Sequence, residues 1–309
     1  MLSNNRNVIA IVGPTCTGKS ALSLDMAELL GGEIINADSM QVYRHFNIGT
    51  AKPDVASFEK CGHHLIDIVD AHEEFNAAIF KERADEAIRQ IKIRGNLPIL
   101  VGGTGLYLRA LAYGLFAAPT DKTLREELRD VYEKDPIFLY DELKRVDHAY
   151  AMRISVRDKV RVVRAVEVFR LTGKPMSELE RDHGFGEARY SMLKIGLKRE
   201  RDELYRRINR RVDEMFVRGW VGEVEKLLSM GLDETAKPFS GIGYREIILY
   251  IKGLIHYDDM VEEIKKHTRH YAKRQFTWFA KERDVSWFRY PEDNEDIRVK
   301  TAEFLERWN

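Results

Sequence analysis

The sequence predicts an α/β protein in which helices cover both faces of a parallel sheet, with an additional all-helical insertion. Three observations support this class. Short apolar runs rich in β-branched residues alternate with helix-length segments through the first third of the chain. Residues 120–190 are charged, helix-periodic and poor in strand signals, and the pattern from residue 199 onward is again almost wholly helical. The predicted domains are therefore a core of residues 1–119 and 191–309 and a helical insertion of residues 120–190.

Each predicted strand is a short apolar run, and each predicted helix has apolar residues at helical spacing. The strands cover residues 8–12, 34–36, 65–69, 98–101 and, returning to the same sheet after the insertion, 193–197. The helices of the core cover residues 19–30, 79–93, 203–217, 221–230, 244–251 and 260–279. Residues 291–296 are expected to form a loop before one last short helix.

Composition narrows the class of protein further. With 44% hydrophobic and 32% charged residues among 309, the chain is neither collagen-like nor wholly disordered. Two cysteines, Cys16 and Cys61, are too few for a disulfide framework, and no Cys/His spacing suggests zinc. The N-terminus lacks an apolar leader and no apolar run is long enough to span a membrane. We expect a cytoplasmic protein without a membrane partner, and a monomer because no heptad seam is evident.

The strongest local signal lies between the first predicted strand and the first predicted helix. The residues are Gly13, Pro14, Thr15, Cys16, Thr17, Gly18, Lys19 and Ser20, which fit the nucleotide-binding P-loop pattern G-x-x-x-x-G-K-[ST]. Backbone N–H groups and the helix N-terminus would hold two linked phosphates, with Lys19 against their oxygens. The Ser20 hydroxyl would join the coordination of a magnesium ion. The motif leaves open whether a diphosphate or a triphosphate such as ATP is bound.

Two further segments follow strands at the same edge of the sheet, where open α/β sheets bind ligands. Asp38 begins one of them, and from position alone it is equally well explained as a catalytic base or metal ligand and as a helix cap. Ser39 and Gln41 add neutral donors and acceptors there. The other segment, Gly102 to Tyr107, contains a Gly-Gly-Thr-Gly turn that includes Thr104. Alone it would be a tight turn, but beside a P-loop the ligand-binding interpretation is favoured.

Charge placement qualifies the net charge, which is zero from 50 bases and 50 acids and at first argues against nucleic acid. Residues 265–283 hold seven bases and one acid, interleaved with aromatic side chains, and residues 153–164 hold five bases and one acid. The expected basic faces are Arg157, Arg161 and Arg164 on one helix, opposite a face of Val160, Val163 and Val166, and Lys265, Arg269 and Lys273 on another. Such stripes are usually solvated faces, but two of them on a phosphate-binding protein favour nucleic acid.

Together these motifs form an ordered set that resembles the tRNA dimethylallyltransferases, also called tRNA isopentenyltransferases, over nearly the whole chain. The set reads Gly13-Pro14-Thr15-x-x-Gly18-Lys19-Ser20, Asp38-Ser39-Met40-Gln41-Val42-Tyr43, Ile48-Gly49-Thr50-Ala51-Lys52-Pro53, Gly102-Gly103-Thr104-Gly105-Leu106-Tyr107, Arg161-x-x-Arg164-Ala165-x-Glu167-Val168-Phe169, Arg207-Ile208-x-x-Arg211-Val212-x-x-Met215, Gly243-Tyr244-Arg245-Glu246 and Lys273-Arg274-Gln275-x-Thr277-Trp278. A P-loop alone would be far less specific. The absence of Cys/His pairs near residue 309 makes the chain similar to the bacterial members.

The resemblance implies transfer of the dimethylallyl group from dimethylallyl diphosphate to N6 of the adenosine next to the anticodon of tRNA, at position 37, with Mg²⁺ and release of diphosphate. It implies a P-loop core and a helical insertion that clasps the anticodon stem-loop. It also implies that Asp38 is the general base, with Lys19 and Thr104 in the catalytic group, and that Arg207 and Arg211 join the P-loop residues in holding the diphosphate. The segments expected to contact tRNA comprise Asp38, Ser39, Met40, Gln41, Thr104, Val160, Arg161, Val162, Val163, Arg164, Lys273, Arg274, Gln275, Trp278 and Lys281.

The sequence departs from the family pattern at two places, and three alternatives to this function stay open. Cys16-Thr17 replaces the usual Ala-Ser of the P-loop, and residues 117–125 match the family only loosely. A P-loop small-molecule kinase would use a triphosphate donor. An adenylate isopentenyltransferase would use the same donor on a free nucleotide, and would need neither the insertion nor the basic segment 265–283. A non-enzymatic RNA-binding module would have no use for the P-loop and Asp38.

Overall fold

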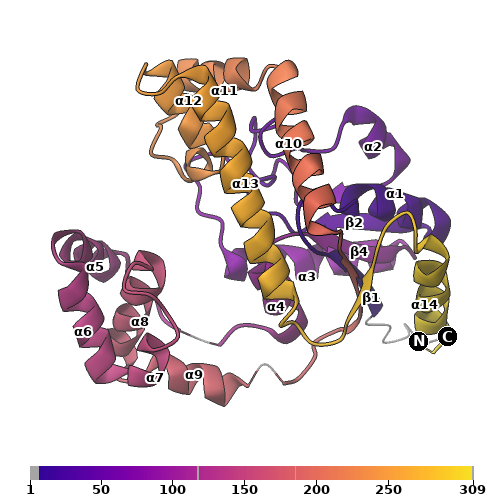
Figure 1. Cartoon of the computed structure of the whole chain (residues 1–309). Coiled ribbons are helices and arrows are strands. Elements are labelled where there is room, and N and C mark those ends of the chain that lie inside the picture. Colours follow the sequence, from indigo (N-terminus) through magenta and orange to yellow (C-terminus); the bar gives the residue numbers. More distant parts are fainter. Residues whose placement is uncertain (1–6, 117, 185, 308–309) are drawn as a thin grey trace. The chain divides into compact units, whose positions relative to one another are not determined.

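The computed structural model describes residues 7–116, 118–184 and 186–307, and within them a six-stranded parallel sheet has the order β3-β2-β4-β1-β5-β6 (Figure 1). The strands are β1 (Asn7–Val12), β2 (Gly32–Asn36), β3 (His63–His64), β4 (Leu97–Gly102), β5 (Ser191–Leu197) and β6 (Val285–Phe288). Helices cover both faces of this sheet, so the predicted fold class is confirmed.

The central strand β1 explains why the sheet needs two layers of helices. Every residue of β1 is buried, and its side chains alternate between two apolar clusters. Val8, Ala10 and Val12 face the larger cluster, to which α3 (Ala77–Ile93) and α4 (Gly105–Tyr113) contribute. Ile9 and Ile11 face the smaller cluster, formed with α1 (Lys19–Leu30) and α14 (Asn294–Glu306). A strand buried on both faces reads as the continuous apolar run seen in the sequence.

The other elements that belong with the sheet are helical. It comprises α2 (Val55–Lys60), α10 (Arg201–Val217), α11 (Trp220–Ser229), the 3-10 turn η1 (Lys237–Ser240), α12 (Tyr244–Ile251) and α13 (Tyr257–Phe279). The predicted bounds of α1 and α12 are confirmed residue for residue, and those of α3, α10, α11 and α13 within a few residues. None of the helices in the described ranges has both the length and the apolar character of a membrane span.

Three predicted elements are wrong, each for a local reason. The third strand is His63–His64 instead of residues 65–69, because Leu65 and Asp67 have left-handed backbones with φ of 62° and 55°. Strand β6 was predicted as part of a helical region; it is a four-residue edge strand that pairs with β5, too short to show a periodicity. The last helix begins inside the predicted loop and is 13 residues long, so it is not short.

The chain divides into two compact units, one of which is Tyr113–Ala188. This helical unit contains α5 (Lys122–Lys134), α6 (Pro136–Val146), α7 (His148–Ala151), α8 (Lys159–Thr172) and α9 (Met176–His183). Ala112 directly precedes this unit and Arg189 directly follows it, and both belong to the core unit. The Arg189 N–H donates to the Ala112 carbonyl at 2.8 Å, which joins the two ends. The predicted domain ranges also include residues 1–6, 117, 185 and 308–309, which lie outside the described residues.

The helical unit has its own core and a buried charge network. Leu128, Leu139 and Leu143 pack against Val162 and Val166 of α8. Glu167 of α8 is fully buried. Its carboxylate accepts hydrogen bonds from Arg125 at 3.1 Å, Arg164 at 2.8 Å and the Asp121 N–H at 3.0 Å. A buried carboxylate requires such pairing, so these contacts fix the start of α5 against α8.

Candidate active site

The P-loop bends sharply between β1 and α1, as the motif predicts. Gly13 and Gly18 adopt φ of 132° and 107°, and a Cβ at Gly13 would overlap the Leu197 carbonyl of β5. Cys16 also has a left-handed backbone, with φ 64°. The Lys19 ammonium donates to the Pro14 carbonyl at 2.6 Å, and the Thr17 hydroxyl donates to the same oxygen at 2.9 Å. The loop therefore closes on itself while the N-terminal N–H groups of α1 remain directed at a ligand position.

We define the phosphate cavity as the volume of about 460 Å³ next to this loop. It is lined by Cys16, Gly18, Lys19, Ser20, Ala21, Ala51, Lys52, Arg207, Arg211, Glu214, Met215 and Arg218. Arg211 donates to the Thr15 hydroxyl at 3.2 Å, and Arg207 donates to the Cys16 carbonyl at 3.4 Å. The structure thus brings both predicted arginines from α10 to the P-loop.

The electrostatics of the phosphate cavity favour an anion. Burial, followed by the positive charge of Arg211, lowers the pKa of Lys19 to about 8, while Cys16 and Asp38 oppose that shift. An ammonium group whose pKa is lowered by a neighbouring cation gains stability when a multivalent anion enters between the two. The cavity is therefore prepared for phosphate oxygens.

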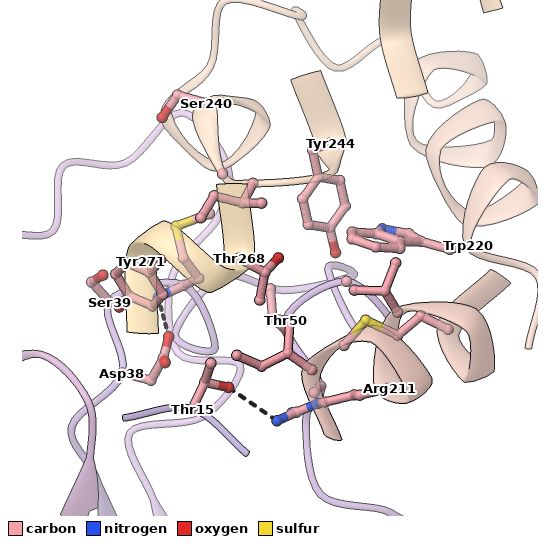
Figure 2. Close-up of a pocket in the computed structure, with 18 of the residues that line it drawn as sticks. Thr15, Asp38, Ser39, Thr50, Arg211, Trp220, Ser240, Tyr244, Thr268 and Tyr271 are labelled. Carbon is pink, nitrogen blue, oxygen red and sulfur yellow. Dashed lines mark hydrogen bonds between the residues drawn. The ribbon is translucent and has the colours of Figure 1, made fainter. Parts of the chain in front are cut away.

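A second cavity, the apolar chamber, adjoins the phosphate cavity and has a volume of about 340 Å³ (Figure 2). Its lining includes Thr15 at the P-loop, Asp38, Ser39, Met40, Gly49, Thr50, Ala51, Ile208, Arg211, Val212, Met215, Trp220, Ser240, Gly241, Ile242, Tyr244, Thr268, Tyr271 and Arg274. Ala51, Arg211 and Met215 line both cavities. A ligand with a phosphate end and a short apolar end would fit across the two.

Asp38 lines the apolar chamber and, with Lys19 and Ser20, a further cavity beside the P-loop. The structure shows the turn cap that its position left open, and the catalytic role of Asp38 stays a prediction. Its Oδ1 accepts hydrogen bonds from the N–H groups of Met40 at 2.8 Å and Gln41 at 3.4 Å, so it caps a turn. The same side chain lines the apolar chamber, together with Tyr271 of α13 (Figure 2). Burial, and after it the charge of Asp38, raises the pKa of Tyr271, which keeps that phenol neutral.

Thr104 and Gln275 hold the neighbouring turns in place. The Ser39 N–H donates to the Thr104 hydroxyl at 3.3 Å, which joins the Asp38 turn to the glycine turn after β4. Gln275 is buried, accepts from the Thr15 N–H at 2.9 Å and donates to the Gly103 carbonyl at 3.0 Å. The oxygen and the nitrogen of the Gln275 side-chain amide are thus both used inside the protein, so its role is to tie the P-loop to the glycine turn.

The residues predicted to contact tRNA divide into two groups. On α13, Lys273, Arg274 and the following Lys281 are exposed, whereas Trp278 packs on Gly105 and lies 4.9 Å under the Arg109 guanidinium. The predicted stripe along α13 is wrong in part. Lys265 forms an ion pair with Asp213 at 2.9 Å, and Arg269 donates to Asn209 at 2.7 Å, because both side chains pack against α10.

The basic segment of the helical unit also differs from the prediction. Arg157 precedes α8, so it does not share a helical face with Arg161. Val160 is 78% exposed in the first turn, whereas Val162 and Val163 are buried and cannot be reached by a partner in this structure. Arg164 is committed internally, since it donates to the Ala118 and Pro119 carbonyls as well as to Glu167. Of the predicted tRNA contacts at residues 160–164, Val160 and the half-exposed Arg161 remain accessible.

Several lining residues escaped the sequence argument. Trp220 and Tyr271 form walls of the apolar chamber, but each lies in an ordinary helix pattern that carries no local signal. Tyr244 is a third wall; the family motif contains it but assigned it no role. Gln41 donates to the Thr50 and Ala51 carbonyls at 3.0 and 3.1 Å, and so fixes the loop that lines both cavities. The family motif contains that loop, which was the one available hint.

The residues that could hold a metal ion lie beside the P-loop. In the described parts of the chain, no group of three His, Cys, Asp or Glu side chains is arranged for a metal ion. A third cavity of about 380 Å³ is lined by Thr15, Lys19, Ser20 and Asp38, among others. A hydroxyl and a carboxylate beside phosphate oxygens match the oxygen ligands that Mg²⁺ prefers.

Comparison with known proteins agrees with this geometry. The family model described as "IPP transferase" matches residues 41–282. A tRNA dimethylallyltransferase of Geobacter sulfurreducens is 46% identical over 300 residues, covering 96% of both chains. Tertiary similarity extends to the full-length tRNA isopentenylpyrophosphate transferase of Bacillus halodurans, with a TM-score of 0.73, 38% identity and 98% coverage of both chains. A eukaryotic dimethylallyltransferase acting on tRNA gives a TM-score of 0.82 at 28% identity, covering 99% of this chain and 81% of that one.

The parallel sheet, the P-loop and the adjoining apolar chamber define a P-loop enzyme for a substrate that is phosphorylated at one end and apolar at the other. The matches extend over nearly the whole chain and well beyond the P-loop. The chain belongs to the IPP transferase family, the prenyltransferases whose curated members carry the name tRNA dimethylallyltransferase.

Proposed function

We propose that this enzyme transfers the dimethylallyl group of dimethylallyl diphosphate to N6 of the adenosine at position 37 of tRNA. The single observation that carries the proposal is the apolar chamber that adjoins the phosphate cavity, with Asp38 in the lining of the chamber. A diphosphate would lie on the P-loop, and its five-carbon group would lie against Val212 and Met215 of α10. The names of the curated relatives support the choice of donor and acceptor.

The reaction needs one bond formed, one broken and one proton removed. N6 attacks C1 of the allyl group, the C1–O bond to the diphosphate breaks, and the N6 proton passes to the Asp38 carboxylate. Within the described residues, the hydrogen bonds of the Asp38 side chain involve Oδ1, which leaves Oδ2 for the amine. Removal of the proton during attack avoids a full positive charge on a weakly nucleophilic amine. Thr104 acts through the turn that it holds beside Asp38.

The leaving diphosphate is stabilised by groups around the P-loop. Lys19, Arg207 and Arg211 supply positive charge, and the N–H groups at the start of α1 supply hydrogen bonds. The Ser20 hydroxyl would hold Mg²⁺ together with the diphosphate oxygens. When bound, Mg²⁺ would neutralise part of the charge that develops on the diphosphate.

The acceptor must present an unstacked adenine, because N6 cannot reach a buried allyl group from inside a stacked loop. Lys273, Arg274 and Lys281 would contact RNA phosphates near the core unit, and the helical unit would clasp the anticodon stem-loop. Because the acceptor is a tRNA, we expect the reaction in the cytoplasm.

A matrix of donors and acceptors tests the proposal. The donors are dimethylallyl diphosphate and ATP, and the acceptors are unmodified tRNA with adenosines at positions 36 to 38 and AMP, all with Mg²⁺. Of the four combinations, we expect product only from dimethylallyl diphosphate with tRNA. Product on AMP but not on tRNA would instead identify an adenylate isopentenyltransferase, and phosphoryl transfer from ATP would identify a kinase.

A further inference from the structure

Trp220 closes the end of the apolar chamber that lies away from the P-loop. Thr15 and Arg211 line the chamber at the phosphate side, and Trp220 and Tyr244 line it at the other side (Figure 2). Trp220 is 2% exposed and belongs to the largest apolar cluster of the core unit. A donor that is anchored by its diphosphate would therefore direct the far end of its chain at the indole ring.

The indole ring is held so that it cannot retreat. A Cβ at Gly49 or at Gly243 would overlap the ring, so the backbone contacts it from two sides. Aromatic neighbours complete the enclosure, with ring centroids at 5.6 Å for Phe216 and 5.7 Å for Tyr244. A wall packed in this way responds to a longer ligand by strain rather than by yielding.

A carboxylate fixes the backbone on one side of the ring. Glu223 of α11 accepts hydrogen bonds from the N–H groups of Asn47 at 2.9 Å, Ile48 at 2.7 Å and Gly49 at 3.3 Å. The Tyr244 hydroxyl donates to the same carboxylate at 2.7 Å. The loop, the tyrosine and the helix that carries Trp220 are thus joined in one hydrogen-bonded unit.

We propose that Trp220 determines the chain length of the donor, by admitting the five-carbon dimethylallyl group and rejecting a ten-carbon geranyl group. The proposal rests on the proposed function, since it assumes an allyl diphosphate across the two cavities. Each extra methylene in a packed apolar site is discriminated by about tenfold or more. A geranyl group adds a whole isoprene unit, which would have to lie against the indole ring. Replacing the indole with a small side chain lengthens the chamber toward Phe216.

The test measures kcat/KM for dimethylallyl diphosphate and for geranyl diphosphate with tRNA as acceptor, together with inhibition by geranyl diphosphate. The variants are Trp220→Ala and, to keep an apolar side chain if that protein does not fold, Trp220→Leu. Trp287→Ala is the matched control, because it removes an indole that packs on Phe276 and lies outside the lining of the chamber. The ratio of the two kcat/KM values is independent of the fraction of folded enzyme.

We expect the parent enzyme and Trp287→Ala to reject geranyl diphosphate, and the ratio to rise by about tenfold or more in the Trp220 variants, with tighter inhibition by geranyl diphosphate. A parent that uses geranyl diphosphate as well as dimethylallyl diphosphate overturns the inference. So does an unchanged ratio in the Trp220 variant that folds, with inhibition also unchanged. A parent that transfers neither group to tRNA refutes the proposed function instead, so the two failures are distinguishable.

Discussion

The phosphate cavity and the apolar chamber share Ala51, Arg211 and Met215, yet they are built in different ways. Five lining residues of the phosphate cavity, Cys16 and Gly18–Ala21, come from one short segment, and backbone N–H groups in such a segment suit phosphate binding. The apolar chamber collects side chains from four α-helices, α10, α11, α12 and α13, and from several loops, including residues 49–51. The first kind of site has a local sequence signature, whereas the second depends on how distant elements pack.

Asp38 lines the apolar chamber and the third cavity beside Lys19 and Ser20, so its substitution has the largest expected effect on activity. Asp38→Asn keeps an oxygen that accepts the Met40 N–H at Oδ1 but removes the base. We expect single-turnover transfer to fall by about two to four orders of magnitude, with tRNA binding largely retained. Rapid-quench assays with saturating donor measure this.

Asp38→Ala separates the base from the turn cap. It loses both functions, so we expect it to be as slow as Asp38→Asn and also less stable to heat. Transfer by Asp38→Asn at the parental rate would show that Asp38 is only a cap.

Lys19 gives the next effect, confined to the phosphate side. Lys19→Met removes a charge-assisted contact and should weaken inhibition by inorganic diphosphate by about 10- to 100-fold. The pKa of Lys19 is about 8 in the free enzyme, and a bound anion raises it. The lysine is therefore charged below pH 8, and affinity should decline as pH rises above 8. Titrations between pH 7 and pH 9 measure this decline.

The Lys19→Met variant is the control for that pH dependence. Ionisation of the diphosphate itself affects both proteins equally, so the difference between the two curves reports Lys19. Parallel curves across this range would contradict a lowered pKa for the lysine.

On the apolar side, Val212→Ala enlarges the chamber without touching the P-loop. We expect KM for dimethylallyl diphosphate to rise by about tenfold, because the allyl group loses apolar contacts. Inhibition by inorganic diphosphate should not change, since that ligand has no apolar end. Equal loss for both ligands would mean that the two cavities do not divide the donor as proposed.

The smallest effect tests the same contrast on α13, between exposed and internally paired bases. Lys273→Ala should lower the slope of tRNA affinity against salt concentration by about one, which is the loss of one phosphate contact. Lys265→Ala is the matched control, because Lys265 pairs with Asp213 and should leave that slope unchanged. Filter binding at several salt concentrations measures both slopes. A lower slope for Lys265→Ala with an unchanged slope for Lys273→Ala would contradict the assigned pairing.

The same difference between local signals and long-range packing decides which features could be predicted from the sequence. The P-loop turn and the bounds of α1 and α12 could be predicted directly, because each depends on local chemistry. The position of Asp38 in the sequence left its role open. Strand β6 could not, since an edge strand of four residues has no periodicity and its partner β5 lies far away in the chain. The inward packing of Lys265 and Arg269 against α10 was equally hidden, because charge spacing does not show what faces a helix.

Trp220 illustrates the limit for the site itself. Its position in α11 looks like any buried aromatic residue, and its importance arises from Gly49 and Gly243, which come from separate segments. Only the assembled fold places a rigid wall opposite the phosphate cavity.

Locating the transferred group on the tRNA tests the proposed reaction directly. After reaction of unmodified tRNA with dimethylallyl diphosphate and Mg²⁺, nuclease digestion and mass spectrometry identify the modified nucleoside and its position. We predict one N6-dimethylallyladenosine, at position 37, and none in tRNA with guanosine at that position. A dimethylallyl group on another nucleoside, or at another position, would contradict it.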